Sequence, residues 1–400
     1  MFISHKKKKI IGLLFSSLTF SIAQASSVIA LTVEELRIEK ATLAIPLVVN
    51  KLDNTVNDFS NALSTFEHTD KSESAYNKLT TLIEVHGNSL WKKAYNSFHY
   101  QKNLDDRPLY WARLKMTKVL RQSPTFLKLS PPKQTELLWA FELSSRGNRH
   151  ISFDQKTDNK ILLLGFDPFL LDRNIEQNNP SGVTALAFDN LHIEYQGTTA
   201  EIETLIVPVR FADFDQGMIE TLLTPFLKSN SVDMILTVSM GREDFDLERF
   251  PGLRRSVTAP DNLNIKTGAN PKNPLIPMLK GEPLDGKEFL EFSLPATHMM
   301  KAKGPFKIFD NRNVTIAAPS LSSLLNNAKD NEPIAVQGSG GGYLSNEISY
   351  RSLRLRNLYN PTLPVGHIHT PRVSNLDINV HHNIVVQIES MIKHALVTLK

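Results

Sequence analysis

The sequence predicts an α/β fold of three layers, in which a mostly parallel central sheet carries helices on both faces, preceded by an all-helical N-terminal region. Two observations predict it. Residues 160–400 alternate short apolar runs, typical of buried strands, with helical patterns. Residues 32–150 instead show apolar residues at helical spacings. We therefore expect a helical domain over 26–150 and an α/β domain over 151–400.

The N-terminal region is predicted to form several helices. Thr32 and Glu35 have the spacing of a capping box, in which each side chain bonds a free amide at a helix start. Apolar residues then recur on one helix face, at Val49, Leu52, Val56, Phe59, Leu63 and Phe66. Further helices are predicted at 76–85, 90–99, 108–120 and 135–143, followed by a polar link over 144–159. The apolar stripe is short, which favours a buried bundle face over a partner-binding coiled-coil seam.

The second half contains three strong strand candidates, at 161–166, 202–209 and 232–239. Weaker candidates lie at 334–337 and 366–370, and helices are predicted at 214–228, 320–327, 344–358 and 381–399. Reactive residues in folds of this kind sit at the carboxyl ends of the strands. We therefore look for chemistry where these apolar runs end.

The first 25 residues resemble an export signal. Four lysines at 6–9 precede an apolar run, and Ala23-Gln24-Ala25 provides a small-x-small cleavage site. The alternative is an uncleaved membrane anchor, but the apolar core is short for a bilayer of about 30 Å. We expect an exported protein, periplasmic or secreted, with no membrane span once the signal is removed.

Composition excludes several function classes. Removal of the signal takes four lysines and leaves 41 basic against 41 acidic residues, so the high isoelectric point does not indicate nucleic-acid binding. The chain has no cysteine, which excludes disulfides, thiolate nucleophiles and cysteine-ligated zinc. The sequence does not predict the oligomeric state.

Three motifs with suggestive spacing lack residues that their chemistry needs. Residues 281–287 have phosphate-loop spacing, but Glu288 follows where serine or threonine is required. The glycine-rich run 338–342 matches neither the dinucleotide fingerprint nor the Gly-x-Ser-x-Gly elbow. His367 and His369 alternate along a strand but have no further ligand motif beside them. We expect no metal and no cofactor.

Several separated motifs agree in order and spacing with one family. They are Gly-Phe-Asp-Pro-Phe at 165–169, Asn-Pro-Ser at 179–181, Gly-Arg at 241–242, Glu-Arg at 248–249, Pro-Asp-Asn at 260–262, Gly-Tyr-Leu-Ser-Asn at 342–346 and Ile-His-Thr-Pro at 368–371. Together they resemble the pyroglutamyl peptidase I family, the pyrrolidone carboxyl peptidases. The resemblance runs from about 160 to 399 and leaves the helical half uncovered.

The resemblance implies an α/β/α fold and a Cys-His-Glu triad that removes N-terminal pyroglutamate from peptides. It implies that His369 is the general base and that Glu248 orients its ring. In this sequence Ser345 occupies the nucleophile position. Ser-His-Glu is a workable triad, although a hydroxyl must give its proton to the base during attack.

The resemblance also implies an apolar slot for the lactam ring. Phe166 and Phe169 would form its walls, because aromatic rings can sandwich a flat, uncharged amide and exclude water. Tyr343 and Leu344 would be further substrate contacts. The family carries an arginine where this sequence has Thr258, and Arg254 or Arg255 could replace its charge.

Each of these residues also has a plainer interpretation. Ser345 could be only the N-cap of the helix that follows. Glu248 could form a surface ion pair with the adjacent arginine, the two phenylalanines could be core residues, and His369 could be a structural histidine.

Three hypotheses follow. The first is an exported hydrolase that uses Ser345, His369 and Glu248 on N-terminally blocked peptides. Backbone amides in the run 338–342 or at the helix start after Ser345 would stabilise the oxyanion. The second is a catalytically inactive homologue that binds peptide ends or partners. The third is an interaction module in which the helical half carries the function.

Overall fold

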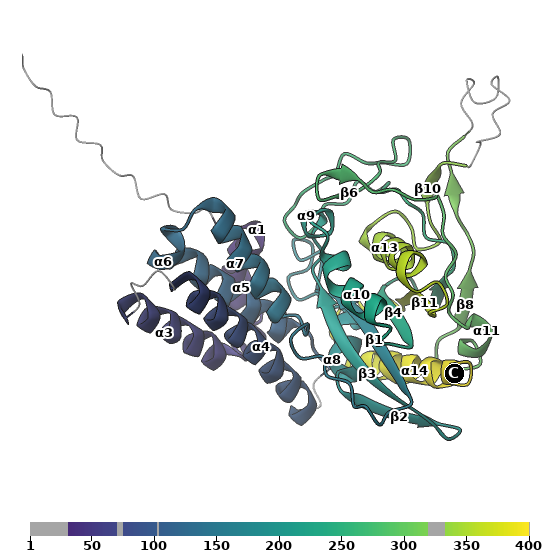
Figure 1. Cartoon of the computed structure of the whole chain (residues 1–400), viewed down its shortest axis with the longest axis horizontal. Helices are drawn as coiled ribbons and strands as arrows, with labels where there is room; N and C mark the ends of the chain where they lie inside the picture. Colours follow the sequence, from purple (N-terminus) through teal and green to yellow (C-terminus); the bar gives the residue numbers. More distant parts are fainter. Residues whose placement is uncertain (1–30, 70–74, 102–103, 319–332, 400) are drawn as a thin grey trace, which may run out of the picture.

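The computed structural model describes residues 31–69, 75–101, 104–318 and 333–399. Two lobes lie side by side in it (Figure 1): a helical lobe, α1 to α7, and a sheet lobe that contains the remaining elements. The expected signal, residues 1–25, and the helix expected at 320–327 lie outside the described residues. None of the helices in the described ranges has the length and apolarity needed to cross a membrane.

The helical lobe contains α1 (Val33–Ala44), α2 (Pro46–Val49), α3 (Asp53–Thr69), α4 (Ala75–Gln101), α5 (Arg107–Gln122), α6 (Pro124–Leu127) and α7 (Pro131–Ser144). The predicted capping box is present at the start of α1, where the Glu35 amide donates to Thr32 Oγ1 at 3.2 Å and the Thr32 amide donates to Glu35 Oε2 at 2.7 Å. The apolar stripe faces inward, because all of it is buried except the half-buried Phe66. The all-helical N-terminal region is therefore confirmed.

One helix prediction in this lobe was wrong. The segments 76–85 and 90–99 form a single long helix, α4, that continues through Gly87. A glycine in mid-helix usually weakens it. Here it allows close packing on α7, since a Cβ at Gly87 would lie 2.1 Å from Ser144 Oγ. Tertiary packing thus outweighs the low helix propensity of glycine, and the helix has no break between 85 and 90.

The sheet lobe is built on seven strands in the order β2-β3-β1-β4-β11-β5-β8. They are β1 (Asn159–Phe166), β2 (Leu191–Tyr195), β3 (Thr198–Val207), β4 (Met234–Met240), β5 (Phe245–Glu248), β8 (Ile308–Asn311) and β11 (Val365–Thr370). Neighbouring strands are parallel except for β2 with β3 and β5 with β11. This arrangement confirms the mostly parallel sheet.

Helices cover both faces of this sheet, which completes the three layers (Figure 1). α8 (Pro180–Phe188) and α14 (Ile378–Leu396) pack together on one face, and α10 (Met218–Ser229) and α13 (Leu344–Tyr359) pack together on the other. The helical lobe joins the sheet lobe partly through α4, which packs on α8. Two short helices, α9 (Phe211–Asp215) and α11 (Ala296–Met299), complete the lobe.

Two predictions in the sheet lobe need correction. The helix expected over 214–228 is divided into α9 and α10, because Gly217 between them adopts the left-handed region with φ of 86°. The strand expected at 334–337 does not join the central sheet. As β10 (Ala335–Gln337) it pairs with β9 (Thr315–Ile316), while β6 (Met278–Leu279) and β7 (Glu282–Pro283) form another short hairpin.

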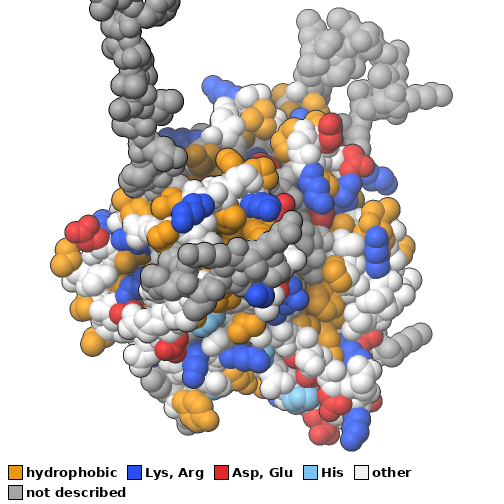
Figure 2. Space-filling model, turned by 60° about the vertical axis from the view of Figure 1, so that its left-hand side comes forward, with side chains coloured by type: hydrophobic (Ala, Val, Ile, Leu, Met, Phe, Trp, Pro, Cys, Tyr) orange, Lys and Arg blue, Asp and Glu red, His pale blue; other side chains and the backbone are white. Residues whose placement is uncertain are grey.

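The surface of the helical side carries mixed charge. Figure 2 shows this face, on which basic and acidic side chains are scattered among apolar ones. A nucleic-acid-binding surface usually has basic residues gathered on one face or stripe. The face in Figure 2 gives no support to that function.

Candidate active site

A histidine and a glutamate form a close buried pair on the sheet. β5 runs antiparallel to β11, with His369 opposite Asp246, so Glu248 is a diagonal neighbour of His369 on the same sheet face. The Nδ1 atom of His369 lies 2.6 Å from Glu248 Oε1. A carboxylate at this nitrogen favours the tautomer with the proton on Nδ1 and leaves Nε2 as the acceptor. Within the described residues, Nε2 has no hydrogen-bond partner.

Asn311, which sequence reasoning missed, holds this pair in place. Its Nδ2 donates to Glu248 Oε2 at 2.9 Å and to the Ser339 carbonyl at 3.0 Å. It thereby connects the pair to the glycine loop, residues 338–342. A Cβ added to Gly340 in this loop would lie 3.6 Å from both His369 Cε1 and Glu248 Cγ. The loop therefore covers the histidine–glutamate pair.

Ser345 lies beside this loop but does not bond the histidine. Its Oγ donates to the Gly340 carbonyl at 3.2 Å. Among the described residues, no hydrogen bond joins Ser345 to His369. The N-cap of α13 is Tyr343, so the alternative that Ser345 is the cap is wrong. The structure brings His369 and Glu248 into contact, whereas the Ser345 hydroxyl bonds the Gly340 carbonyl of the loop that covers this pair.

The four expected slot residues and Ser345 line one cavity of about 170 Å³, here called the slot. It is lined by Phe166, Phe169, Asn179, Val209, Ser239, Met240, Tyr343, Leu344, Ser345 and Arg372. Tyr343 is fixed by its hydroxyl, which donates to the Pro260 carbonyl at 2.9 Å. Phe166 is also a core residue, because its ring stacks on Phe214 at 6.2 Å. The slot is small and mainly apolar, with a few polar side chains in its lining, a composition common in sites for small molecules.

Two further cavities adjoin the slot. One, of about 350 Å³, is lined by the glycine loop, His369 and Glu248, and it shares Met240 with the slot. The other, of about 1050 Å³, is lined by charged and polar residues and is here called the polar cleft: Arg242, Glu243, Asp244, Asp246, Phe309, Asp310, Asn311, Arg312, Asn313, Arg372 and Ser374. Arg372 lines both the slot and the polar cleft. It directly follows the Ile-His-Thr-Pro motif, a position that could have identified it from the sequence.

The two arginines expected to replace the family's arginine charge are engaged elsewhere. Arg255 lies 2.6 Å from Glu347 and 2.8 Å from Asp215. Burial alone would lower the pKa of Arg255, but these carboxylates raise it overall. Arg254 lies 2.7 Å from Glu288. Neither residue lines the slot, so this expectation was wrong, and Arg372 is the arginine found there.

The structure also bears on the suggested ion pair of Glu248 and on the alternating histidines His367 and His369. Glu248 is not paired with the adjacent Arg249, whose Nε lies 2.7 Å from Asp310 Oδ1. The imidazole of His367 is fully buried, with Nδ1 2.8 Å from Thr237 Oγ1 and Nε2 2.8 Å from Ser239 Oγ. Both of its nitrogens are therefore occupied by hydroxyl groups, and neither is directed with His369 at a shared metal position.

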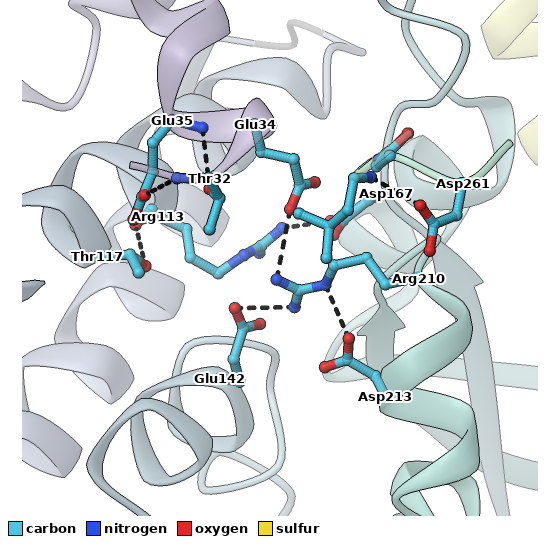
Figure 3. Close-up of polar contacts among 12 residues, drawn as sticks. Thr32, Glu34, Glu35, Arg113, Thr117, Glu142, Asp167, Arg210, Asp213 and Asp261 are labelled. Carbon is cyan, nitrogen blue, oxygen red and sulfur yellow. Dashed lines mark hydrogen bonds and ion pairs between the residues drawn. The ribbon is translucent and has the colours of Figure 1, made fainter. Parts of the chain in front are cut away.

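The helical lobe supports the slot from behind. Asp167, which follows the slot residue Phe166, receives an ion pair from the buried Arg113 of α5 (Figure 3). It receives a second from the buried Arg146, just after α7. Arg146 Nη1 lies 2.8 Å from Asp167 Oδ2. Burial would lower the pKa of Arg146, but Asp167 and Glu142 raise it overall. The backbone that carries the slot aromatics is therefore tied to the helical lobe.

A second connection runs from α1. Arg37 lies 2.6 Å from Asp172 and also donates to the Asn262 carbonyl. The Asn262 side chain in turn donates to the Pro168 carbonyl at 2.9 Å. Arg37 therefore connects the loop that follows the motif at 165–169 to the loop that contains the Pro-Asp-Asn motif at 260–262. These long-range contacts could not be inferred from sequence spacing.

Comparisons with known proteins give a family and a set of structural neighbours. The model for the PA0049 N-terminal domain matches residues 19–142, and the model for the PA0049 C-terminal domain matches 160–283 and 292–374. The "Uncharacterized protein PA0049" of Pseudomonas aeruginosa is 26% identical, over 75% of this chain and 71% of its own.

Pyrrolidone carboxyl peptidase from Pyrococcus furiosus, 20% identical, matches with a TM-score of 0.41 over 60% of this chain and 100% of its own. A mutant of that enzyme, 19% identical, has the same TM-score and coverage. The family models cover both lobes and together match more than half of the sequence. The chain belongs to the PA0049 family.

Proposed function

We propose that this chain is an exported hydrolase that removes N-terminal pyroglutamate, or a related blocked residue, from peptides. Ser345 is the nucleophile, His369 the general base and Glu248 the group that orients the base. The observation that carries this proposal is the buried hydrogen bond of 2.6 Å between His369 and Glu248, next to a small apolar slot that contains Ser345. The resemblance of the surrounding motifs to the pyroglutamyl peptidase I family supports the same assignment.

The reaction begins with the blocked residue in the slot. The lactam ring lies among the aromatic and apolar side chains, and the peptide continues into the adjoining cavities. Ser345 Oγ attacks the carbonyl carbon of the blocked residue, and its proton passes to His369 Nε2. Glu248 stabilises the imidazolium that forms. The same proton then goes to the leaving amine, and a water activated by His369 hydrolyses the acyl-serine.

One rearrangement precedes this attack. The Ser345 hydroxyl must exchange its bond to the Gly340 carbonyl for one to His369, which requires a rotation about the Cα–Cβ bond. Catalytic hydrogen bonds are often formed only in the substrate complex, so this geometry is compatible with catalysis. When the lactam lies in the slot, the substrate carbonyl must lie beside the Ser345 hydroxyl. Its presence there favours the exchange of hydrogen-bond partners.

Backbone amides at the start of α13 are the best candidates for the oxyanion site. The first amides of a helix have no partner within the helix, and the N-cap residue of α13 makes no side-chain bond to them. In the glycine loop, by contrast, the Ser339 and Gly341 amides already donate to the carbonyls of Phe250 and Gly338 at 2.9 Å. The negative oxygen of the tetrahedral intermediate would therefore face the helix start.

A release assay with a pyroglutamyl chromogenic substrate tests the proposal. We expect activity in the wild type that Ser345→Ala lowers by at least about a thousandfold in kcat. Ser352→Ala is the matched control, because Ser352 is also on α13 and its hydroxyl donates to the Ile348 carbonyl away from the slot. Loss of activity in Ser352→Ala equal to that in Ser345→Ala would contradict a specific role for Ser345.

The hydrogen bond between Ser345 and the Gly340 carbonyl favours a second candidate, a protein that binds blocked peptide ends without cleaving them. Titration calorimetry with a pyroglutamyl dipeptide distinguishes the two. Binding by a wild type without activity, together with activity gained in Ser345→Cys, would support the binding protein. Neither binding nor activity in any variant would contradict both candidates.

A further inference from the structure

Three side chains with metal-ligating atoms meet at the boundary between the two lobes, away from the slot. His150 follows the end of α7, Asp189 follows α8, and Glu203 lies in β3. One ligand atom from each, a ring nitrogen or a carboxylate oxygen, lies within 4.8 Å of the other two. A histidine and two carboxylates are a donor set that binds divalent transition cations.

One carboxylate oxygen of the cluster lacks a hydrogen bond. Glu203 Oε2 is a buried atom without a hydrogen-bond partner among the described residues. The Glu203 residue is only 2% exposed. A buried carboxylate oxygen with no partner is costly and uncommon. A cation bound between these groups would give this oxygen a partner.

Hydrogen bonds from the protein hold the two carboxylates in place. Asp189 Oδ1 accepts hydrogen bonds from the Thr204 amide and hydroxyl, each at 3.2 Å, and Asp189 Oδ2 accepts one from Trp91 Nε1 at 2.9 Å. Glu203 Oε1 accepts one from the Ser152 amide at 3.3 Å. Hydrogen bonds of this kind orient ligands in metal sites. The indole that binds Asp189 comes from α4, so the cluster connects the helical lobe to the sheet.

One distance in the cluster suits a small cation. Atoms about 2.0–2.1 Å from a tetrahedral zinc ion lie about 3.3 Å from one another. His150 Nδ1 and Asp189 Oδ2 are 3.1 Å apart, close to that edge length. The side chain of His150 is 20% exposed, which leaves a path for the ion and for a water ligand.

The charge of the cluster also favours a cation. In the described part of the chain, no lysine or arginine forms an ion pair with Asp189 or Glu203. Two carboxylates are therefore buried near each other without a basic partner apart from His150. We propose that His150, Asp189 and Glu203 form a structural site for one divalent transition cation, for which Zn²⁺ is the best match. The bound ion would connect the link after α7, which carries His150, to β3 and to the end of α8.

The test uses the full chain without an affinity tag, treated with EDTA and then dialysed against Zn²⁺. We expect one zinc per chain by elemental analysis, and a rise in melting temperature when zinc is added back. Co²⁺ in place of zinc should give the visible absorption of a low-symmetry site. His150→Ala and Glu203→Gln should each weaken zinc binding at least about tenfold, the usual scale for loss of a metal-site contact.

Two matched controls separate this site from others. His192 is on the adjacent strand β2 and its side chain is 55% exposed, 3.7 Å from Glu201, so His192→Ala should leave zinc affinity unchanged. His369→Ala should also leave it unchanged. Circular dichroism of each variant verifies folding, and the partly exposed His150 provides a variant that is expected to fold even where Glu203→Gln does not. Absence of stoichiometric zinc, or a folded His150→Ala with wild-type affinity, would overturn the proposal.

Discussion

Arg146 Nη1 lies 2.8 Å from Asp167 Oδ2. The buried guanidinium at the end of the helical lobe therefore holds Asp167, which lies in the segment that carries two slot residues. Asp167 follows Phe166 and precedes the loop that carries Phe169. The Asn179 side chain, which lines the slot, donates to the Asp167 carbonyl at 2.9 Å. The helical lobe is therefore part of the structure that positions the slot, and not an independent attachment.

This relationship gives the first prediction. Arg146→Ala leaves Asp167 and Glu142 buried with one cationic partner fewer, and breaking a buried ion pair in this way costs about 3–5 kcal/mol. We expect a clear loss of stability in urea unfolding, together with weaker binding of a pyroglutamyl dipeptide. All three tryptophans, Trp91, Trp111 and Trp139, are in the helical lobe, so their fluorescence reports its unfolding.

The control is Arg149→Ala, three residues further along. Arg149 forms an ion pair with Glu84, and its side chain is 53% exposed. Exposed pairs contribute about 0–1 kcal/mol, so this variant should remain close to wild type in both stability and ligand affinity. Equal effects of the two substitutions would show that the buried contact with Asp167 has no special role.

The second prediction concerns the orientation of His369. In Glu248→Gln, the amide can donate to Nδ1, which places the imidazole proton on Nε2 and removes the acceptor that the proposed mechanism assigns to the serine proton. We expect kcat for the pyroglutamyl substrate to fall by about 10⁴-fold with little change in KM, as expected when a triad carboxylate is replaced by its amide. Glu291→Gln is a suitable comparison, because Glu291 is 58% exposed and paired with Arg249. A KM effect without a kcat effect would assign Glu248 to binding instead.

The sequence predicted the fold best where apolar runs are long. β1 and β4 are almost wholly buried, so their runs stand out, whereas β5 has four residues that include two acids and was not found. The antiparallel place of β5 beside β11, which brings Glu248 to His369, is a property of the assembled sheet. The motif resemblance nevertheless assigned Glu248 and His369 to one site, although the strand that contains Glu248 was not predicted.

Other features of the site depend on contacts that local pattern cannot show. Arg37 reaches a carbonyl 225 residues away along the chain, and no spacing rule connects such positions. The bond from Ser345 to the Gly340 carbonyl depends on one side-chain rotamer. Arg254 and Arg255 were chosen for nearness in sequence to Thr258, but their nearest acids, Glu288 and Glu347, determine where they point.

The third prediction concerns Arg372, which lines both the slot and the polar cleft. We propose that its guanidinium takes the place of the arginine that the pyroglutamyl peptidase I family carries where this sequence has Thr258. For a pyroglutamyl dipeptide with a free carboxylate, we expect Arg372→Ala to raise KM by about tenfold, with kcat changed less, because a single exposed charged contact contributes on the order of 1 kcal/mol to binding. The effect should shrink at high salt, since solvent screens exposed charges. Wild-type KM in this variant at low salt would remove Arg372 from the substrate site.

The last prediction is a pH dependence of stability. Burial, reinforced by the neighbouring His369, keeps the pKa of His367 well below its usual value near 6.5. The folded protein therefore holds His367 neutral, while the unfolded chain takes up a proton there as the pH falls below about 6.5. The contribution of His367 to stability is fully present above that pH and is lost at up to about 1.4 kcal/mol per pH unit below it. His367→Gln retains hydrogen-bonding groups for Thr237 and Ser239 but has no titrating group, so its unfolding free energy should fall less steeply than that of the wild type between pH 6.5 and 5. Urea unfolding of both proteins across this range measures the difference, and parallel curves would mean that His367 titrates alike in the folded and unfolded states.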